Sequence, residues 1–490
     1  MAADEDRPLK AARVQETKEH RLTPDLPEDV LADVLRRVPP RWLAASRCVC
    51  KAWRDAIDAH RLLRADLLPL SFAGLFVHFN DHKYPEFFAR PSSSGDAVSG
   101  NLSFLPSTAP HAGTIWDNCD DWHDYRVEDH CNGLLLLGKN RVVNPATRRW
   151  NAFPPCPAQD YARWKMRYTR RLVYDPMIST HYEVFMIPCL HDKGRGEEDE
   201  SDLSMEESEW PSSPCKMYVF SSRTGCWEEK YFVRQGDAAR TVSEMRVGWM
   251  EFRDAAVYFR RALYVHCGAA FLMRISLSDN TYRVIKPPIV IKSEYFLDLN
   301  IVRSEKGVYF VAFEEDNCLL RVWILHESCG EMEWMLKDDI DINHVLACHQ
   351  FNQCVRGHWI LEDINYNLFC STRSSNEIKE ASTEHTYEWN SDNDDDVEDC
   401  YQNKGSRDRI DYDIQILGFH PHKEIVFLSE SDETKITGLA YHLNSSKIEV
   451  LGNICPEGYS HFNELLNDDI RLVMSSPYTP CWIGEFPKNN

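Results

Sequence analysis

Cysteine and histidine residues that could bind a metal ion lie together in the segment CHQFNQCVRGH, residues 348–358. The four candidate ligands, of the nitrogen and sulfur types that zinc prefers, are Cys348, His349, Cys354 and His358. The two cysteines are too far apart for the short C-x2-4-C knuckle of structural zinc sites. Cys48 and Cys50 have only Val49 between them, whereas a redox C-x-x-C motif has two intervening residues. Neither segment predicts a metal or redox site.

Aspartate residues alternate in the segment SDNDDDVED, residues 391–399, as they do at the start of a calcium-binding loop. Asp392, Asp394 and Asp396 would supply oxygen ligands. However, Val397 stands where the sharp turn of such a loop needs glycine, and Asn403 stands where the loop carries its last glutamate. We interpret the segment as a disordered acidic insertion.

The sequence contains none of the strings G-x-S-x-G, H-E-x-x-H, Walker A or G-x-G-x-x-G that mark common hydrolase, zincin and nucleotide sites. An enzyme would therefore have to assemble its site from scattered residues. We predict a chain with no catalytic residues, no cofactor and no bound metal.

Charge and cysteine content restrict the partners and the compartment. The net charge of −22 opposes binding to a polyanion, so we expect no nucleic acid partner. The 17 cysteines have no regular spacing, which favours a reducing compartment. No apolar leader is evident, and residues 262–273 form an apolar run too short to cross a bilayer. We expect the cytoplasm and/or the nucleus as the location, and no membrane partner.

Short helices are predicted in the N-terminal segment LPEDVLADVLRRVPPRWLAASRCVCKAWRDAID, residues 26–58. The first begins near Pro27 and ends before Pro39 and Pro40, with aliphatic residues at helical spacing along one face. A second can begin near Arg41, and a third carries Val49, Ala52, Trp53, Ala56 and Ile57. So small a unit buries little surface of its own, so its apolar face is expected to meet another chain. The alternative is a helical cap packed on the core of this same chain.

These residues resemble the F-box, the helical module by which substrate adaptors dock on Skp1-type proteins. The resemblance implies an apolar docking surface formed or supported by ten residues: Leu26, Pro27, Val30, Leu31, Val34, Leu35, Val38, Leu43, Val49 and Trp53. Burying several of them, at roughly 1.5 to 3 kcal/mol each, is expected to stabilise a complex after the entropy of association is subtracted.

Beyond residue 67, short β-rich runs alternate with turns. A strand, a polar turn and a second strand recur, and the second strand is marked by Trp150, Trp227, Tyr282, Trp334 and Ile448. Without the acidic insertion near residues 191–214, the first three separations are about 50 residues, and the last is roughly twice as long. A repeat of this length is typical of a propeller of four-stranded blades, and we expect about five to seven of them. An irregular pair of β-sandwiches is the alternative.

The segment CNGLLLLGKNRVVNPATRRWNAFPP, residues 131–155, is similar to the start of the F-box-associated domain that follows the F-box in many plant proteins. The predicted fold class is α+β multidomain, with a small three-helix F-box followed by an all-β, propeller-like (kelch-like) domain. The expected divisions are a disordered tail at 1–22, the F-box at 23–66, and a β domain at 67–485 with acidic insertions near 191–214 and 371–411.

The resemblance implies a non-catalytic substrate-recognition subunit of a Skp1–cullin–F-box ubiquitin ligase. Its expected partners are a Skp1-like adaptor, a cullin and a RING subunit reached indirectly, and a protein substrate whose contact residues the sequence leaves open. The acidic insertions favour a basic target by charge alone. The alternatives are a propeller enzyme with a helical cap and an F-box scaffold that works outside a ligase.

Overall fold

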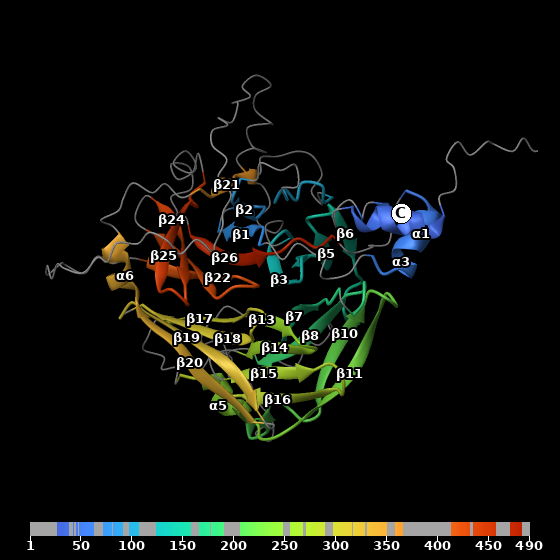
Figure 1. The fold of residues 1–490 in the computed structure, drawn as a ribbon. Helices are drawn as coiled ribbons and strands as arrows, with labels where there is room; N and C mark the ends of the chain where they lie inside the picture. The colour runs from blue at the N-terminus through green and yellow to red at the C-terminus, as the bar shows by residue number, and fades with distance from the viewer. Residues whose placement is uncertain are drawn as a thin grey trace, which may run out of the picture. The chain divides into compact units, whose positions relative to one another are not determined.

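A computed structural model gives the fold of the chain (Figure 1). The residues that it describes run from 27 to 482, apart from 39–42, 44–45, 48, 63–71, 81, 92–97, 107–123, 158–165, 177, 191–205, 248–254, 268–270, 290–296, 316, 329–330, 350–357, 366–412, 432–434 and 457–470. The chain divides into two compact units, Met1–Leu67 and Leu68–Asn490, called here the helical unit and the β domain.

The helical unit contains helices α1 (Glu28–Arg36) and α3 (Lys51–Ala59). Pro27 precedes α1 in an extended conformation, and its carbonyl oxygen accepts the amide of Leu31 at 3.0 Å. The two helices agree with the first and third helices expected from the sequence, except that Val49 precedes α3 rather than lying in it. Much of the expected middle helix lies outside the described residues, so three helices are not established.

The described residues of the β domain form six four-stranded units, two of them joined in one eight-stranded sheet, and within each unit neighbouring strands are antiparallel. In the order in which their strands are hydrogen-bonded, unit 1 is β26 (Leu472–Tyr478), β1 (Gly74–Phe79), β2 (Glu86–Ala89) and β21 (Ile360–Glu362), and unit 2 is β3 (Val127–Cys131), β4 (Leu134–Leu137), β5 (Arg141–Asn144) and β6 (Arg149–Ala152). Unit 3 is β7 (Met166–Val173), β8 (Glu183–Leu190), β10 (Cys215–Ser221) and β11 (Cys226–Arg234). Unit 4 is β13 (Ala256–Phe259), β14 (Ala262–Cys267), β15 (Phe271–Ser276) and β16 (Thr281–Ile285).

The remaining two units follow the same plan. Unit 5 is β17 (Leu297–Arg303), β18 (Val308–Glu314), β19 (Leu319–Ser328) and β20 (Glu331–Asp341), and unit 6 is β22 (Asp413–Phe419), β23 (Ile425–Ser431), β24 (Ile436–His442) and β25 (Lys447–Asn453). The described chain also contains the short pair β9 (Glu209–Trp210), between β8 and β10, and β12 (Arg240–Thr241), after β11. Helix α5 (Val242–Val247) follows β12, and α6 (Ile342–His349) follows β20. The coarser expectation of a mostly β-stranded region after the F-box is confirmed.

The first strands of the units gather in the middle of the β domain. Figure 1 shows β3, β7, β13, β17, β22 and β26 there, with the fourth strands β6, β11, β16, β20 and β25 toward the periphery. First strands contact one another between units, as in β3 with β7, β17 with β22, and β22 with β26. Apolar side chains fill the space between consecutive units: one cluster joins units 5 and 6, another units 6 and 1, and others units 1 and 2 and units 4 and 5.

Unit 1 combines strands from distant parts of the chain. The C-terminal strand β26 pairs with β1, and β2 pairs with β21. The residues after β26 pack on unit 2, where the buried side-chain amide of Asn144 donates to the carbonyl oxygen of Cys481 at 2.9 Å. Gly133 has φ +88°, and a Cβ there would lie 2.5 Å from that of Cys481. The Asn-Gly and Asn-Pro turns of the segment 131–155 therefore hold the C-terminal end of the chain.

The five marker positions of the sequence repeat all lie on the fourth strands of units 2 to 6. The indole nitrogens of Trp227 and Trp334 donate to the carbonyl oxygens of Pro154 and Lys286, 2.8 and 2.9 Å away, just after the preceding unit's last strand. The long separation before Ile448 includes residues 350–357 and 366–412, which lie outside the described residues. Among described residues, this interval adds α6 and β21 but no further four-stranded sheet.

Units 3 and 4 are joined into an eight-stranded sheet by a parallel pairing of their fourth strands. Val233 and Arg234 on β11 lie opposite Thr281 and Tyr282 on β16. The Tyr282 hydroxyl donates to the carbonyl oxygen of Ser212 at 2.8 Å, which fixes the last part of the first acidic insertion against this junction. In the described part of that insertion, Trp210 is buried.

Candidate functional site

Helix α1 carries apolar residues on two faces, and the helical unit buries only one of them. Leu31 and Leu35 are buried in a small core that also contains Ala32, Leu43, Ala56, Ile57 and Leu62. Val38 and Trp53 are partly buried against this core. Because side chains three to four residues apart share a helix face, Leu31 and Leu35 define the inward face of α1.

Val30 and Val34 form a second row, also four residues apart, on the exposed side of α1. Their exposed fractions are 45% and 52%, and Val49, in the turn before α3, is 64% exposed. Pro27, at the start of α1, is exposed as well. We call Pro27, Val30, Val34 and Val49 the valine surface. Single exposed aliphatic side chains are common, whereas several on one small unit are a feature of sites where another protein binds.

Polar contacts brace the unit that carries this surface. Arg47 forms an ion pair with Asp58 of α3, with its Nη2 atom 2.8 Å from the carboxylate oxygen Oδ2. The side chain of Arg47 is only 13% exposed. This pair ties the turn that bears Val49 to α3, which limits how far Val49 can move relative to the helices.

The ten residues predicted to form or support a docking surface thus have different positions. Leu31, Leu35 and Leu43 are core residues, Val38 and Trp53 line the core, and Leu26 lies outside the described residues. Only the four residues of the valine surface are exposed. Covering three half-exposed valines contributes roughly 3 kcal/mol, less than the roughly 4 to 15 kcal/mol that association costs. The energetic expectation from sequence counted leucines that the helical unit already buries, so the three valines alone would not stabilise a complex.

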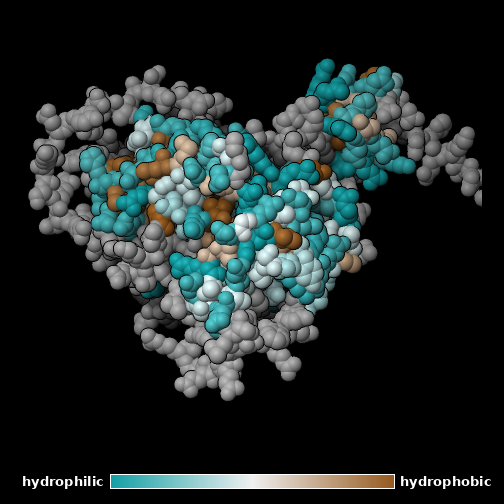
Figure 2. Space-filling model, turned by 90° about the horizontal axis from the view of Figure 1, so that it is seen from below, coloured by the Kyte–Doolittle hydropathy of each residue, from teal (hydrophilic) through white to brown (hydrophobic). Residues whose placement is uncertain are grey.

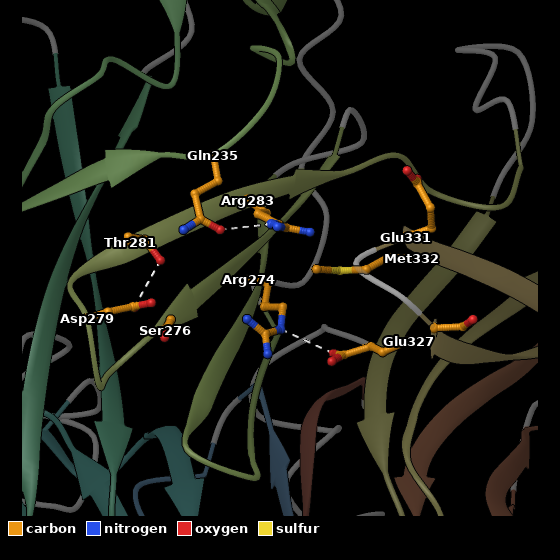
Figure 3. Close-up of a pocket in the computed structure, with 10 residues that line it drawn as sticks. Gln235, Arg274, Ser276, Asp279, Thr281, Arg283, Glu327, Glu331 and Met332 are labelled. Atoms are coloured by element: carbon orange, nitrogen blue, oxygen red, sulfur yellow. Dashed lines mark hydrogen bonds and ion pairs between the residues drawn. The ribbon is translucent and has the colours of Figure 1, made fainter.

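The β domain presents a different kind of surface. On the face drawn in Figure 2, its hydrophobic residues form small separate spots within a largely hydrophilic surface. A polar pocket of about 340 Å³ lies between units 4 and 5 and is shown in Figure 3. It is lined by Arg274 and Arg283 of unit 4 and by Glu327 and Met332 of unit 5. Sequence reasoning missed this pocket, because its residues come from separate hairpins and carry no local motif.

Buried ionisable groups of the β domain have perturbed pKa values. Burial raises the pKa of the Asp129 carboxyl to about 6 even though Arg171 opposes this, and burial lowers the pKa of His130 and His266 to about 4. Although burial of Glu424 acts in the opposite direction, hydrogen bonds from Lys306, Lys337 and Tyr309 lower its pKa to about 2. The two histidines are therefore neutral and Glu424 is charged near pH 7.

Within the described part of the chain, no group of three or more His, Cys, Asp or Glu residues is arranged to hold a metal ion. Cys354 of the zinc-type segment and the whole aspartate-rich segment lie outside the described residues. None of the described helices is long and apolar enough to cross a membrane.

Comparison with known proteins gives a match for the helical unit and weaker matches that cover between 23% and 65% of the chain. Residues 24–65 match the family model described as F-box domain. An F-box protein of Arabidopsis thaliana is 19% identical over 319 residues, which cover 63% of this chain and 67% of that protein. Another is 32% identical over 117 residues, covering 23% of this chain and 29% of the relative.

A third relative from Arabidopsis, named "Putative F-box/kelch-repeat protein", is 27% identical over 180 residues, covering 34% of this chain and 41% of the relative. For several other Arabidopsis F-box proteins, the chain spans about a third of their length. Among solved structures, Bombyx mori GH32 beta-fructofuranosidase BmSUC1 matches at a TM-score of 0.20 and 11% identity, over 56% of this chain and 46% of that chain. That likeness is too low to support an argument.

Proposed function

Residues 24–65 are an F-box domain, and from this premise we propose that the chain is the substrate-recognition subunit of a Skp1–cullin–F-box ubiquitin ligase. The observation that carries the proposal is the valine surface, because it is an apolar surface on a matched F-box that the helical unit leaves uncovered. A Skp1-like adaptor is the partner expected to cover it.

We further infer that the six four-stranded units form a propeller. Three features support this: the contacts between first strands, the apolar clusters between consecutive units, and the pairing of the C-terminal strand β26 with β1. In a sheet of four consecutive antiparallel strands, the fourth strand ends at the same end of the sheet at which the first strand begins. The direct connections between units 2, 3, 4 and 5, the segment from β21 to β22, and the loops joining second to third strands then gather at one end of the propeller.

The described strands that flank both acidic insertions begin or end at this loop-bearing end. Residues 191–205 lie between the second and third strands of unit 3, and residues 366–412 precede the first strand of unit 6. We propose that the β domain captures the target protein. Loops are well suited to this role, because a rigid scaffold positions them while their sequences are free to vary.

In this function the chain performs no covalent chemistry. It raises the local concentration of target lysines around a conjugating enzyme that the cullin and RING subunits recruit. The site of action proposed for such a complex is the cytoplasm and/or the nucleus.

Assembly of purified components tests the proposal. The full-length chain is immobilised and mixed with a cullin and a RING subunit. One sample also contains a Skp1-type adaptor, and a second sample does not. We expect cullin to be recovered only when the adaptor is present, and to be lost from a Val30→Asp/Val34→Asp variant that keeps its helices. Adaptor binding without cullin would favour a scaffold outside a ligase, and no adaptor binding by the folded wild type would refute the F-box role.

A further inference from the structure

The pocket between units 4 and 5 brings two arginines together. One wall consists of β15 and β16, the opposite wall contains the ends of β19 and β20, and Gln235, which follows β11, lines a third side (Figure 3). Its volume of about 340 Å³ is at the lower end of the range for ligand pockets, which is roughly 300 to 1,000 Å³. This space suits one or two side chains of a partner.

Strand register places the two guanidinium groups side by side. Arg274 on β15 and Arg283 on β16 are direct cross-strand partners, so both side chains leave the sheet on the same face. Two like charges in this relation destabilise an antiparallel pair. The pair also contrasts with the chain's net charge of −22. A like-charged pair that lines a cavity is an arrangement that an anionic ligand would stabilise.

The hydrogen bonds in the pocket orient both guanidinium groups through their Nε atoms. Arg274 Nε lies 3.2 Å from the Tyr264 hydroxyl oxygen and 3.1 Å from Glu327 Oε1, and Arg283 Nε lies 3.0 Å from the side-chain oxygen of Gln235. Burial raises the pKa of Tyr264, so its hydroxyl remains protonated. Each guanidinium carries five N–H donors in a rigid fork that matches a carboxylate or phosphate.

The remaining lining residues limit what can bind. Met332 is directed into the same space and packs against the apolar cluster between units 4 and 5, so it offers contact to an aliphatic stem. Asp279, Glu327 and Glu331 carry negative charge around the pocket. An anion therefore binds well only if both arginines contact it. An anion that only took the place of Glu327 in the ion pair with Arg274 would gain little binding free energy.

We propose that this pocket binds an anionic side chain, a carboxylate or a phosphate monoester, presented by the protein that the β domain captures. Arg274 and Arg283 contact the anion from two sides, and Met332 contacts the carbon atoms that carry it. The inference rests on the proposed function, because it assumes that the β domain captures a protein. It names one chemical feature of the target in addition to the basic character suggested by the acidic insertions.

Methyl NMR of the full-length chain tests the proposal. The chain has 12 methionines, and the Met332 methyl signal is assigned with a Met332→Leu variant. The probes are inorganic phosphate and three degenerate peptide pools that differ only in a central phosphoserine, aspartate or serine. We expect a saturable shift of the Met332 methyl signal with the phosphoserine pool, the aspartate pool or both, and none with the serine pool. Comparing the two anionic pools identifies the preferred source of the anion.

Arginine variants provide the controls. Arg274→Gln and Arg283→Gln are each expected to weaken the response at least tenfold, and Arg223→Gln, at an exposed turn between β10 and β11, is expected to leave it unchanged. Arg283→Lys keeps the charge but loses the fork, so intermediate binding is expected. A response that persists in both glutamine variants, or saturation by inorganic phosphate but by no peptide pool, would overturn the proposal. Binding of the Skp1-type adaptor to the same samples shows whether the F-box role stands independently.

Discussion

The helical unit and the β domain differ in how completely they bury their own apolar surface. In the helical unit, seven buried residues form the core while Val30, Val34 and Val49 stay exposed. In the much larger β domain, the units cover each other's apolar faces, the exposed large hydrophobic residues, such as Ile178, Val233 and Ile360, are spread over several units, and the pocket between units 4 and 5 is mainly polar. Under the proposed function, the helical unit would offer apolar contact area to the adaptor, and the β domain would offer oriented charges and loops to the target.

The first prediction compares the same substitution in the two cores. Leu35 and Leu428 both have an exposed fraction of 0%, and replacing a buried leucine by alanine costs roughly 2 to 5 kcal/mol. Leu35→Ala is expected to unfold the helical unit, because its core contains few other residues. Leu428→Ala is expected to lower the melting temperature of the β domain but leave it folded. Hydrogen exchange of the full chain, followed separately in α1 and β23, measures both effects.

If Leu35→Ala kept native exchange protection in α1, the claim that the helical unit depends on so small a core would be wrong.

The second prediction concerns the charged contact between units 5 and 6. Glu424 is 2% exposed and accepts from Tyr309 at 2.9 Å and from Lys337 at 3.0 Å, and it also pairs with Lys306. Glu424→Gln is expected to destabilise the β domain by about 1 to 3 kcal/mol, less than for a fully buried pair, because Lys306 is 60% exposed. Chemical denaturation measures the change.

Glu229→Gln is the matched control, since Glu229 pairs with Lys216 at an exposed position, and no measurable change in stability is expected there. Equal losses in the two variants would argue against a special role for the contact between units.

A third prediction follows from the pKa of Glu424. Its folded-state pKa of about 2 lies below the ordinary value of 4.5, so folding favours the charged carboxylate. The stabilisation is therefore fully present above about pH 4.5 and is lost as the pH falls through 2. The stability difference between the wild type and Glu424→Gln should shrink over this interval. A difference independent of pH between 5 and 2 would contradict the assignment.

The smallest expected effect is at a marker position of the repeat. Trp334→Phe removes the indole donor to the carbonyl oxygen of Lys286 while keeping an aromatic ring, and we expect a loss of about 1 kcal/mol in the unfolding free energy. Trp227→Phe, which removes the equivalent bond to Pro154, should cost a similar amount. Unequal losses would show that the repeated contact is not energetically equivalent in the two units.

Much of the fold was accessible from sequence because it is locally encoded. The aliphatic spacing and the prolines predicted α1, and the marker residues identified the fourth strands of five units. The pairing of β26 with β1 was not predictable, because no local signal links strands almost 400 residues apart.

The candidate surfaces were less predictable than the fold. Val30 and Leu31 both fit the apolar pattern of α1, and only the packing of α3 shows that Leu31 faces inward. The pairing of Arg274 with Arg283 depends on the exact register of one hairpin, and Glu327 comes from the next unit. Periodicity predicts which residues share a face of a helix or strand. Which of these residues remain exposed depends on the elements that pack against that face.

The valine surface is tested most directly by the affinity of the full-length chain for a Skp1-type adaptor. Val34→Asp is compared with Val233→Asp, the same change at a similarly exposed valine of the β domain, with exposed fractions of 52% and 54%. We predict at least a tenfold loss of adaptor affinity for Val34→Asp, with α1 still folded by hydrogen exchange, and no change for Val233→Asp. Wild-type affinity in a folded Val34→Asp variant would contradict the account.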